Sequence, residues 1–229
     1  MSRWMKLIGS MFLAVALGLP AAASANDAAD AKAKVEAANA VMTEIMAAPD
    51  KGIPHDLLKN AKAIAIFPGV VKAGFILGGK YGRGVLIRHV GNSWSAPAFF
   101  SIGAGSIGWQ IGASSTDLVL LIRSERGLES FMKNEFSLGA DASIAAGPVG
   151  RDASAATDVA LKAEILSYSR SRGLFAGLSL EGAKINILDD YAKAYYGKKL
   201  TPRQILFEGK GSMKTEAKKL AATINKYSK

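Results

Sequence analysis

Cysteine is absent from all 229 residues, and its absence excludes several kinds of protein. A chain without thiols forms no disulfide and offers neither a cysteine nucleophile nor a cysteine-bound metal. Histidine is almost as scarce, because only His55 and His89 occur, and neither lies in a recognisable catalytic motif. The sequence also lacks the G-x-S-x-G and H-E-x-x-H patterns of hydrolases. We therefore expect a protein that is not an enzyme and that holds no metal or other cofactor.

Long apolar runs are missing everywhere except at the start of the chain. There the run 7–19 follows Arg3 and Lys6 and precedes the small residues 23–25. It is shorter than the ~20 residues that a membrane-spanning helix needs. A basic, then apolar, then small-residue order is typical of a cleaved secretory signal peptide. We predict a signal peptide at 1–25 and a mature protein that begins near Asn26 in the periplasm, where it can associate with the membrane.

Negative charge is in short supply, and this shortage indicates the kind of partner. The chain has 29 Lys and Arg against 19 Asp and Glu. Removing the two basic residues of 1–25 leaves (29 − 2) − 19 = +8 for the mature protein. Such an excess favours anionic partners, namely a phospholipid or membrane surface or an acidic protein. Export makes nucleic acid an unexpected partner, and a charge that only keeps the protein soluble is the alternative.

Two glycine-rich stretches resemble nucleotide-binding motifs. "GFILGGKY" at 74–81 fits a phosphate loop except at its last position, and "GAGSIG" at 103–108 fits a dinucleotide fingerprint. Both motifs need a helix directly after the glycines to hold the phosphates. The residues that follow each stretch alternate instead with the period of two that is typical of strands. We therefore expect no nucleotide.

The glycines of the first stretch fall on one side of the predicted strands. Gly74, Gly78, Gly82 and Gly84 are all even-numbered, whereas the bulky residues between them are odd-numbered. Residues of one parity share one face of a strand. Two interpretations remain open, which are close packing of backbones and a groove for acyl chains.

The pattern along the mature chain predicts an α+β domain. Its centre is a bent, largely antiparallel, glycine-rich sheet or partly closed barrel, and helices flank it. We expect an N-terminal helix within 26–52 and a domain over 53–229. The expected strands include one that ends before Pro68-Gly69, others across 70–124 and 136–151, and two around Arg172-Gly173. Helices are expected after Pro54, at 124–135, at 188–197, at 201–209 and at 213–227.

The last of these helices is amphipathic and basic. Leu220 and Ile224 belong to its apolar stripe, and the opposite side carries Lys214, Lys218, Lys219 and Lys226. Packing of the stripe on the sheet is one interpretation. The other places the helix on an anionic membrane surface, with these four lysines as its contacts.

Five stretches resemble the SYLF family of lipid-binding domains. They are "AKAIAIFPGVVKAGFILGGKYGRGVL", "SAPAFFSIGAGSIGWQIGASSTDLVLLI", "FSLGADASIAAGPVGR", "EILSYSRSRGLFAGLSLEG" and "YYGKKLTPRQIL". They cover roughly residues 60 to 207 in the order of the family. The resemblance implies binding of phospholipid, and for this chain an anionic lipid of the bacterial envelope.

Basic residues beside the glycine-rich turns are the candidate contacts for a lipid head group. An Arg fork matches two phosphate oxygens, and a Lys adds a point charge. The candidates are Lys72, Lys80, Arg83, Arg88, Arg170 and Arg172. The function we expect is non-enzymatic binding of anionic phospholipid, and the alternative is a periplasmic protein-interaction or envelope-scaffold module.

Overall fold

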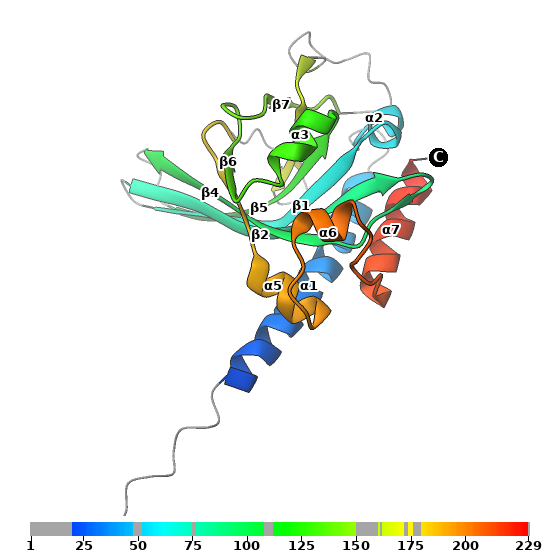
Figure 1. The fold of residues 1–229 in the computed structure, drawn as a ribbon. Helices are drawn as coiled ribbons and strands as arrows, with labels where there is room; N and C mark the ends of the chain where they lie inside the picture. Colours follow the sequence, from blue (N-terminus) through cyan, green and yellow to red (C-terminus); the bar gives the residue numbers. More distant parts are fainter. Residues whose placement is uncertain are drawn as a thin grey trace, which may run out of the picture.

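A curled sheet with helices on both faces forms the protein, as a computed structural model shows (Figure 1). The structure describes residues 20–47, 52–74, 77–107, 112–149, 160, 162–171, 174–175 and 180–228. The helices are α1 (Pro20–Met46), α2 (His55–Lys59), α3 (Glu125–Ser130), α5 (Asp189–Tyr196), α6 (Pro202–Leu206) and α7 (Thr215–Tyr227). The strands are β1 (Ala63–Gly74), β2 (Leu77–Val90), β3 (Ser93–Trp94), β4 (Ala98–Ile107), β5 (Gly112–Ile122), β6 (Glu135–Ser137), β7 (Ile144–Ala146), β8 (Ile165–Ser171), β9 (Leu174–Phe175) and β10 (Lys184–Ile187).

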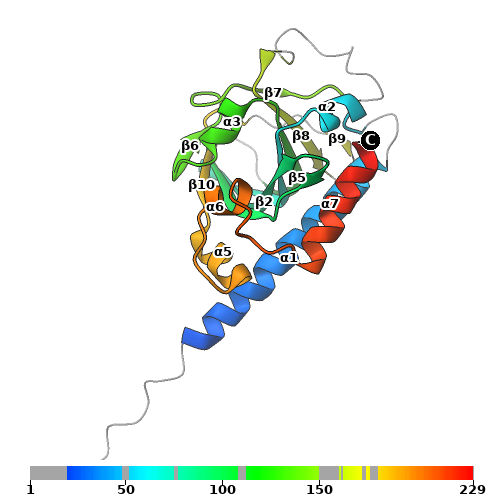
Figure 2. The ribbon, with the colours of Figure 1, turned by 45° about the vertical axis from the view of Figure 1, so that its right-hand side comes forward.

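The strands follow the order β6-β10-β4-β2-β1-β5-β8-β7, with β3 paired to β2 and β9 paired to β8. All pairs are antiparallel except β7 with β8. Figure 2 shows how the sheet curls round, with α3 on the opposite side of it from α1 and α7. The predicted mixed fold with a bent, largely antiparallel sheet is confirmed.

A β-bulge in β1 contributes to this curvature. The register with β2 shifts between Ile66 and Val71, around Pro68-Gly69. Gly69 has a φ of 62°, and its N–H donates to Asp117 Oδ1 at 2.9 Å. The prediction that the strand ends before Pro68 was wrong, because the bulge absorbs a proline that has no N–H to pair and lets β1 continue.

Two glycines of β2 allow the bulged strand to pack closely. A Cβ at Gly84 would lie 2.1 Å from the carbonyl oxygen of Ile66 and 2.7 Å from the ring of Phe67. A Cβ at Gly82 would lie 2.8 Å from Cγ2 of Val70. At these two positions the small residues serve close packing, the first of the two interpretations of the glycine pattern.

Alternate residues of β4 identify the two faces of the sheet. The ring of Phe99 lies 5.1 Å from that of Tyr195 in α5, on the side that we call the outer face. The ring of Phe100 lies 5.4 Å from that of Phe131, which follows α3, on the side that we call the inner face. Strand pairing extends these faces, so the odd-numbered residues of β2 lie on the outer face and the even-numbered ones on the inner face.

The long helix α1 and the C-terminal helix α7 pack against each other beside the outer face (Figure 1). The first buried side chain of α1 among those described is Ala31. From α7, Leu220 and Ile224 are fully buried, and Thr223 Oγ1 donates to Asn39 Oδ1 at 2.6 Å. The apolar stripe of α7 is therefore used inside the protein. Both expected regions contain a helix, but α1 begins at Pro20, earlier than the predicted start after residue 25.

Between α3 and β7 the chain departs from the predicted course. The helix expected at 124–135 ends at Ser130, and it starts after Ser124, whose Oγ accepts from the N–H of Gly127 at 2.9 Å. The strand expected across 136–151 is divided by a turn, because Gly139 has a φ of 89° and its N–H donates to the carbonyl of Ala142 at 2.8 Å. Only β6 and β7 remain as short strands on either side of this turn.

The C-terminal third contains one strand more than predicted. The two strands expected around Arg172-Gly173 are β8 and β9, which pair through Ser171 and Leu174, and β10 follows as a third strand. The predicted helix at 201–209 is the shorter α6. Thr201 caps it, and Gln204 closes the capping box by accepting from the Thr201 N–H at 3.0 Å.

Candidate functional site

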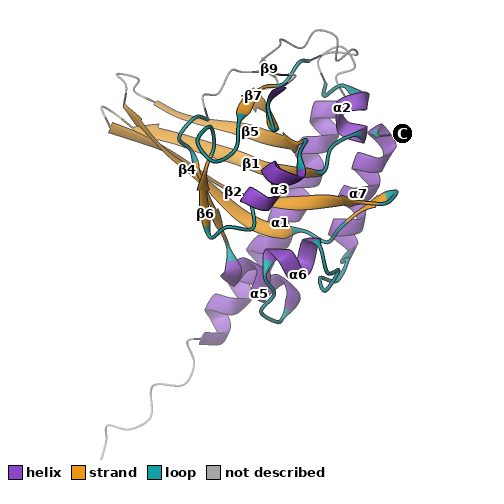
Figure 3. Cartoon of the chain, turned by 45° about the horizontal axis from the view of Figure 1, so that its top comes forward, coloured by secondary structure: helices purple, strands orange, loops and turns teal. Residues whose placement is uncertain are grey.

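The central strands extend beyond the helices at one end of the sheet (Figure 3). We call this part the projecting end and define it as residues 70–74, 77–83, 102–107 and 112–117, which come from β1, β2, β4 and β5. It begins where the bulge of β1 ends, so the bulge sets its direction relative to the rest of the sheet.

Two predicted head-group residues lie opposite each other on its inner face. Lys72 of β1 and Lys80 of β2 are register partners. Like charges directly opposite in a sheet are unfavourable. Partial burial lowers the pKa of Lys80, and the charge of Lys72 lowers it further. The pair therefore forms a local concentration of positive charge that an anion would stabilise.

A third predicted residue, Arg83, lies on the outer face between two tyrosines. Its Nε donates to Tyr81 Oη at 3.0 Å, and its Nη1 donates to the hydroxyl of Tyr191 in α5. Its guanidinium lies 5.1 Å from the ring centroid of Tyr191. The hydrogen bond with Tyr81 raises the pKa of Arg83. Arg83 thus joins the projecting end to α5 and keeps its charge at the border of the helix layer.

Exposed apolar side chains lie on the outer face of the same region. Val71 and Tyr81 are register partners, with 48% and 50% of their surface exposed. Ser115 and Gly103 flank them on β5 and β4. Sequence reasoning missed this pair because Val71 and Tyr81 follow the same alternation as core residues. Only the tertiary structure shows that no described helix covers them.

The other predicted head-group residues lie elsewhere. Arg88 is near the opposite end of β2, with its guanidinium 4.4 Å from the ring centroid of Phe207. Arg170 of β8 forms an ion pair with Glu44 of α1 at 2.6 Å. Arg172 lies outside the described residues. The structure therefore brings together Lys72 and Lys80, with Arg83 nearby on the opposite face, and separates Arg88 and Arg170 from them.

The lysines predicted for a membrane-surface helix also divide. Lys214 precedes α7, donates its Nζ to the carbonyl of Tyr195, and lies 4.4 Å from the centroid of that ring. Lys218, Lys219 and Lys226 are exposed on α7. Since the apolar side of α7 packs on α1, these three lysines are the part of the predicted surface that remains open to a partner.

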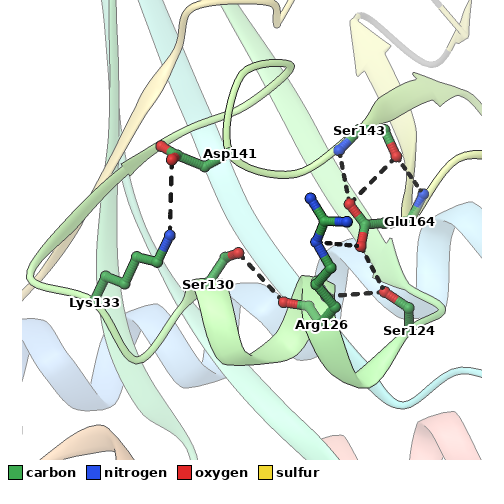
Figure 4. Close-up of polar contacts among 8 residues, drawn as sticks. Ser124, Arg126, Ser130, Lys133, Asp141, Ser143 and Glu164 are labelled. Atoms are coloured by element: carbon green, nitrogen blue, oxygen red, sulfur yellow. Dashed lines mark hydrogen bonds and ion pairs between the residues drawn. The ribbon is translucent and has the colours of Figure 1, made fainter.

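A second polar cluster surrounds Glu164 and has a structural role (Figure 4). Its carboxylate accepts from Ser124 Oγ at 3.3 Å and from the Ser143 N–H at 3.1 Å, and it pairs with Arg126 at 3.5 Å. These contacts hold the start of α3, β7 and the start of β8 together. Within the described ranges, no group of three or more His, Cys, Asp or Glu side chains is placed to hold a metal ion. No described helix is long and apolar enough to cross a membrane.

The described residues thus form a curled sheet, flanked by helices, with a basic and partly apolar exposed end. Residues 103–227 match the Ysc84 family, described as "Las17-binding protein actin regulator". The chain belongs to this family, also known as SYLF, whose members are generally non-enzymatic binding domains. The predicted resemblance is confirmed.

Relatives from yeast and frog show how much of the chain is shared. LAS seventeen-binding protein 3 of Saccharomyces cerevisiae is 36% identical over 161 residues, which cover 69% of this chain and 35% of that protein. SH3 domain-containing YSC84-like protein 1 of Xenopus laevis is 35% identical over 182 residues, which cover 78% of this chain and 54% of that protein. The chain therefore spans about a third to about half of the length of these relatives.

Proposed function

We propose that this protein binds anionic phospholipid at a membrane surface without acting as an enzyme, and that it does so in the periplasm. The observation that carries the proposal is the juxtaposition of Lys72 with Lys80 at the projecting end of the sheet. Two facing ammonium groups repel each other, and a phosphate between or beside them would remove that repulsion. Membership of a family of binding domains supports the same function.

The neighbouring residues fit a lipid surface better than a free phosphate. Tyr81 presents an aromatic ring with a polar tip, the kind of side chain that is enriched where a membrane meets water. Each basic residue near an anionic leaflet contributes about 1 kcal/mol to attraction. Lys72, Lys80 and Arg83 together would contribute about 3 kcal/mol of attraction that weakens as salt rises.

The proposed processing is compatible with the packing of α1. Its first described core side chain is Ala31, so cleavage after Ala25 leaves every described core contact of α1 in place. We propose that the signal peptide 1–25 directs export and that the processed protein, residues 26–229, is the functional form. Sequencing of the N-terminus of the exported protein tests this point, and a start near Asn26 is expected.

Sedimentation with vesicles tests the proposed function. The processed protein is mixed with vesicles of phosphatidylcholine alone, or of phosphatidylcholine containing phosphatidylglycerol, at low and moderate salt. We expect it to pellet only with the anionic vesicles, and more weakly as salt rises. A protein that stays in the supernatant with every vesicle contradicts the proposal.

A protein-interaction or envelope-scaffold module is the second candidate, and the lysine face of α7 favours it. Lys218, Lys219 and Lys226 are exposed on a helix that is anchored on α1. Such a rigid basic face suits an acidic protein partner. A stable complex recovered in the absence of lipid, and lost when Lys218 and Lys219 are replaced by Gln, would support this function instead.

A further inference from the structure

We infer that the protein meets the membrane with the projecting end of its sheet, so that Val71 and Tyr81 enter the interface while Lys72 and Lys80 contact head groups. This inference rests on the proposed lipid binding and adds the surface and the orientation. The partner that contacts the projecting end is therefore an anionic bilayer.

Apolar and basic side chains are paired across one thin layer at the projecting end. Val71 and Tyr81 lie side by side on the outer face, and Lys72 and Lys80 lie side by side on the inner face. These four residues are consecutive pairs of the same two strands. When the end of the sheet enters the head-group region, it presents both the apolar and the basic pair to the lipid. A sheet that lies flat on the membrane presents only one of the two pairs.

The charge of the projecting end complements an anionic membrane. The projecting end contains three cations, which are Lys72, Lys80 and Arg83, and a single carboxylate, which is Asp117. That carboxylate already accepts the N–H of Gly69 in the bulge. The region is therefore positive as a whole and is matched to an anionic surface.

The other exposed apolar side chains lie away from the projecting end. Val90 and Val149 are the other described large apolar side chains with high exposure, and neither belongs to the projecting end. The apolar side of α7 is buried on α1, so its lysines attract an anionic surface without an apolar contact. The projecting end combines both kinds of contact.

Matched substitutions test which surface binds. Val71 and Val90 have the same side chain and the same exposure of 48%, so Val71→Ser and Val90→Ser differ only in location. Val71→Ser and Tyr81→Ser are also made separately and together, so that the contributions of the valine and the tyrosine to binding can be measured one by one. At about 0.15 M salt we expect Val71→Ser with Tyr81→Ser to weaken binding to phosphatidylglycerol vesicles about tenfold. Val90→Ser alone should leave binding unchanged.

The lysines allow an equally strict comparison. Lys72→Gln with Lys80→Gln and Lys218→Gln with Lys219→Gln each remove two positive charges. The first pair should weaken binding about 30-fold, as expected for two basic residues in contact with the surface. The second pair should have less than a threefold effect at the same salt. The opposite ranking would overturn the inference in favour of α7.

Single-cysteine labels report the orientation directly, because the natural chain has no Cys. A polarity-sensitive fluorophore is attached in turn at Ser115→Cys on the projecting end, at Asn92→Cys in the turn between β2 and β3, and at Lys219→Cys on α7. All three side chains are exposed. We expect several-fold brighter, blue-shifted emission with anionic vesicles for the label at position 115 only.

The possible results separate the inference from the proposed function. If the unlabelled protein binds no vesicle, lipid binding itself is wrong. If it binds, but the label at 92 or 219 responds while that at 115 does not, lipid binding stands and the orientation is wrong. If the label at 115 responds to protein concentration without vesicles, a second copy of the chain covers this end and the inference also fails.

Discussion

Individual residues at the bulge decide whether β1 and β2 can pack as they do. At Gly84 there is no room for a Cβ, because the carbonyl of Ile66 would lie 2.1 Å away. At Gly105 of β4 a Cβ would meet no atom within 4 Å. Two glycines of one sheet thus have opposite tolerance for the same added methyl group, which sequence parity alone does not distinguish.

Gly84→Ala is expected to destabilise the protein by ~3 kcal/mol, because the clash involves backbone that cannot rotate away. Gly105→Ala should change the free energy of unfolding by less than about 0.5 kcal/mol. Urea unfolding followed by circular dichroism gives both values. Equal effects at the two positions would show that the close approach at Gly84 is wrong.

The facing lysines should be coupled in their protonation. Lys72→Gln removes the repulsion from Lys72, so we expect the pKa of Lys80 to rise while burial still keeps it below 10.5. Because the folded-state pKa of Lys80 lies below its unfolded value, the folded protein gains stability as pH rises from that lowered pKa toward 10.5. NMR titration of the lysine side chains measures the pKa. At pH 7 the variant should be more stable by about 0.5 kcal/mol.

At the scale of elements, Glu164 connects the start of α3, β7 and the start of β8. Its substitution should therefore loosen all three elements. Glu164→Ala removes the carboxylate to which Ser143 and Ser124 donate hydrogen bonds and with which Arg126 forms an ion pair. We expect a loss of ~2 kcal/mol in the free energy of unfolding. Glu129→Ala is the control, because it breaks the exposed ion pair with Arg203 and should cost at most about 1 kcal/mol. Comparable losses in both variants would contradict the central role of Glu164.

At the scale of elements, the sequence predicted those features that depend only on neighbouring residues. Thr201 and Pro202 indicate the start of α6, and the apolar stripe of α7 indicates a helix with one buried side. The passage of β1 through Pro68 is not visible in the sequence, because the bulge depends on Asp117, 48 positions further along the chain. The division at Gly139 is likewise hidden, since alternation continues across the turn.

The same contrast holds for the candidate site. Lys72, Lys80 and Arg83 were predicted from their positions near glycine-rich turns, and they do lie close to one another. Arg88 and Arg170 share that sequence context but contact Phe207 and Glu44, which belong to segments far away in the chain. Which basic residues gather at one end therefore depends on strand pairing and helix packing, which residue type and spacing do not encode.

For the whole molecule, the salt concentration sets the distance over which the net charge attracts a membrane. The processed protein carries +8, so its lysines attract an anionic membrane even when they do not touch it. This long-range attraction extends ~30 Å at 0.01 M salt and only ~8 Å at 0.15 M. Contacts made at the membrane surface itself are screened much less. Salt therefore distinguishes lysines that contact lipid from lysines that only add to the field.

We predict that both double-lysine variants bind more weakly than the unaltered protein at 0.01 M salt, but that only one of them does so at 0.15 M. At low salt, Lys72→Gln with Lys80→Gln and Lys218→Gln with Lys219→Gln both weaken binding to phosphatidylglycerol vesicles, because each lowers the net charge from +8 to +6. At 0.15 M only the first variant remains weak, since the exposed lysines of α7 lie beyond the screening distance of a membrane that contacts the projecting end. Binding isotherms at the two salt concentrations measure this. Two variants that bind equally at 0.15 M would mean that total charge, rather than the projecting end, determines binding.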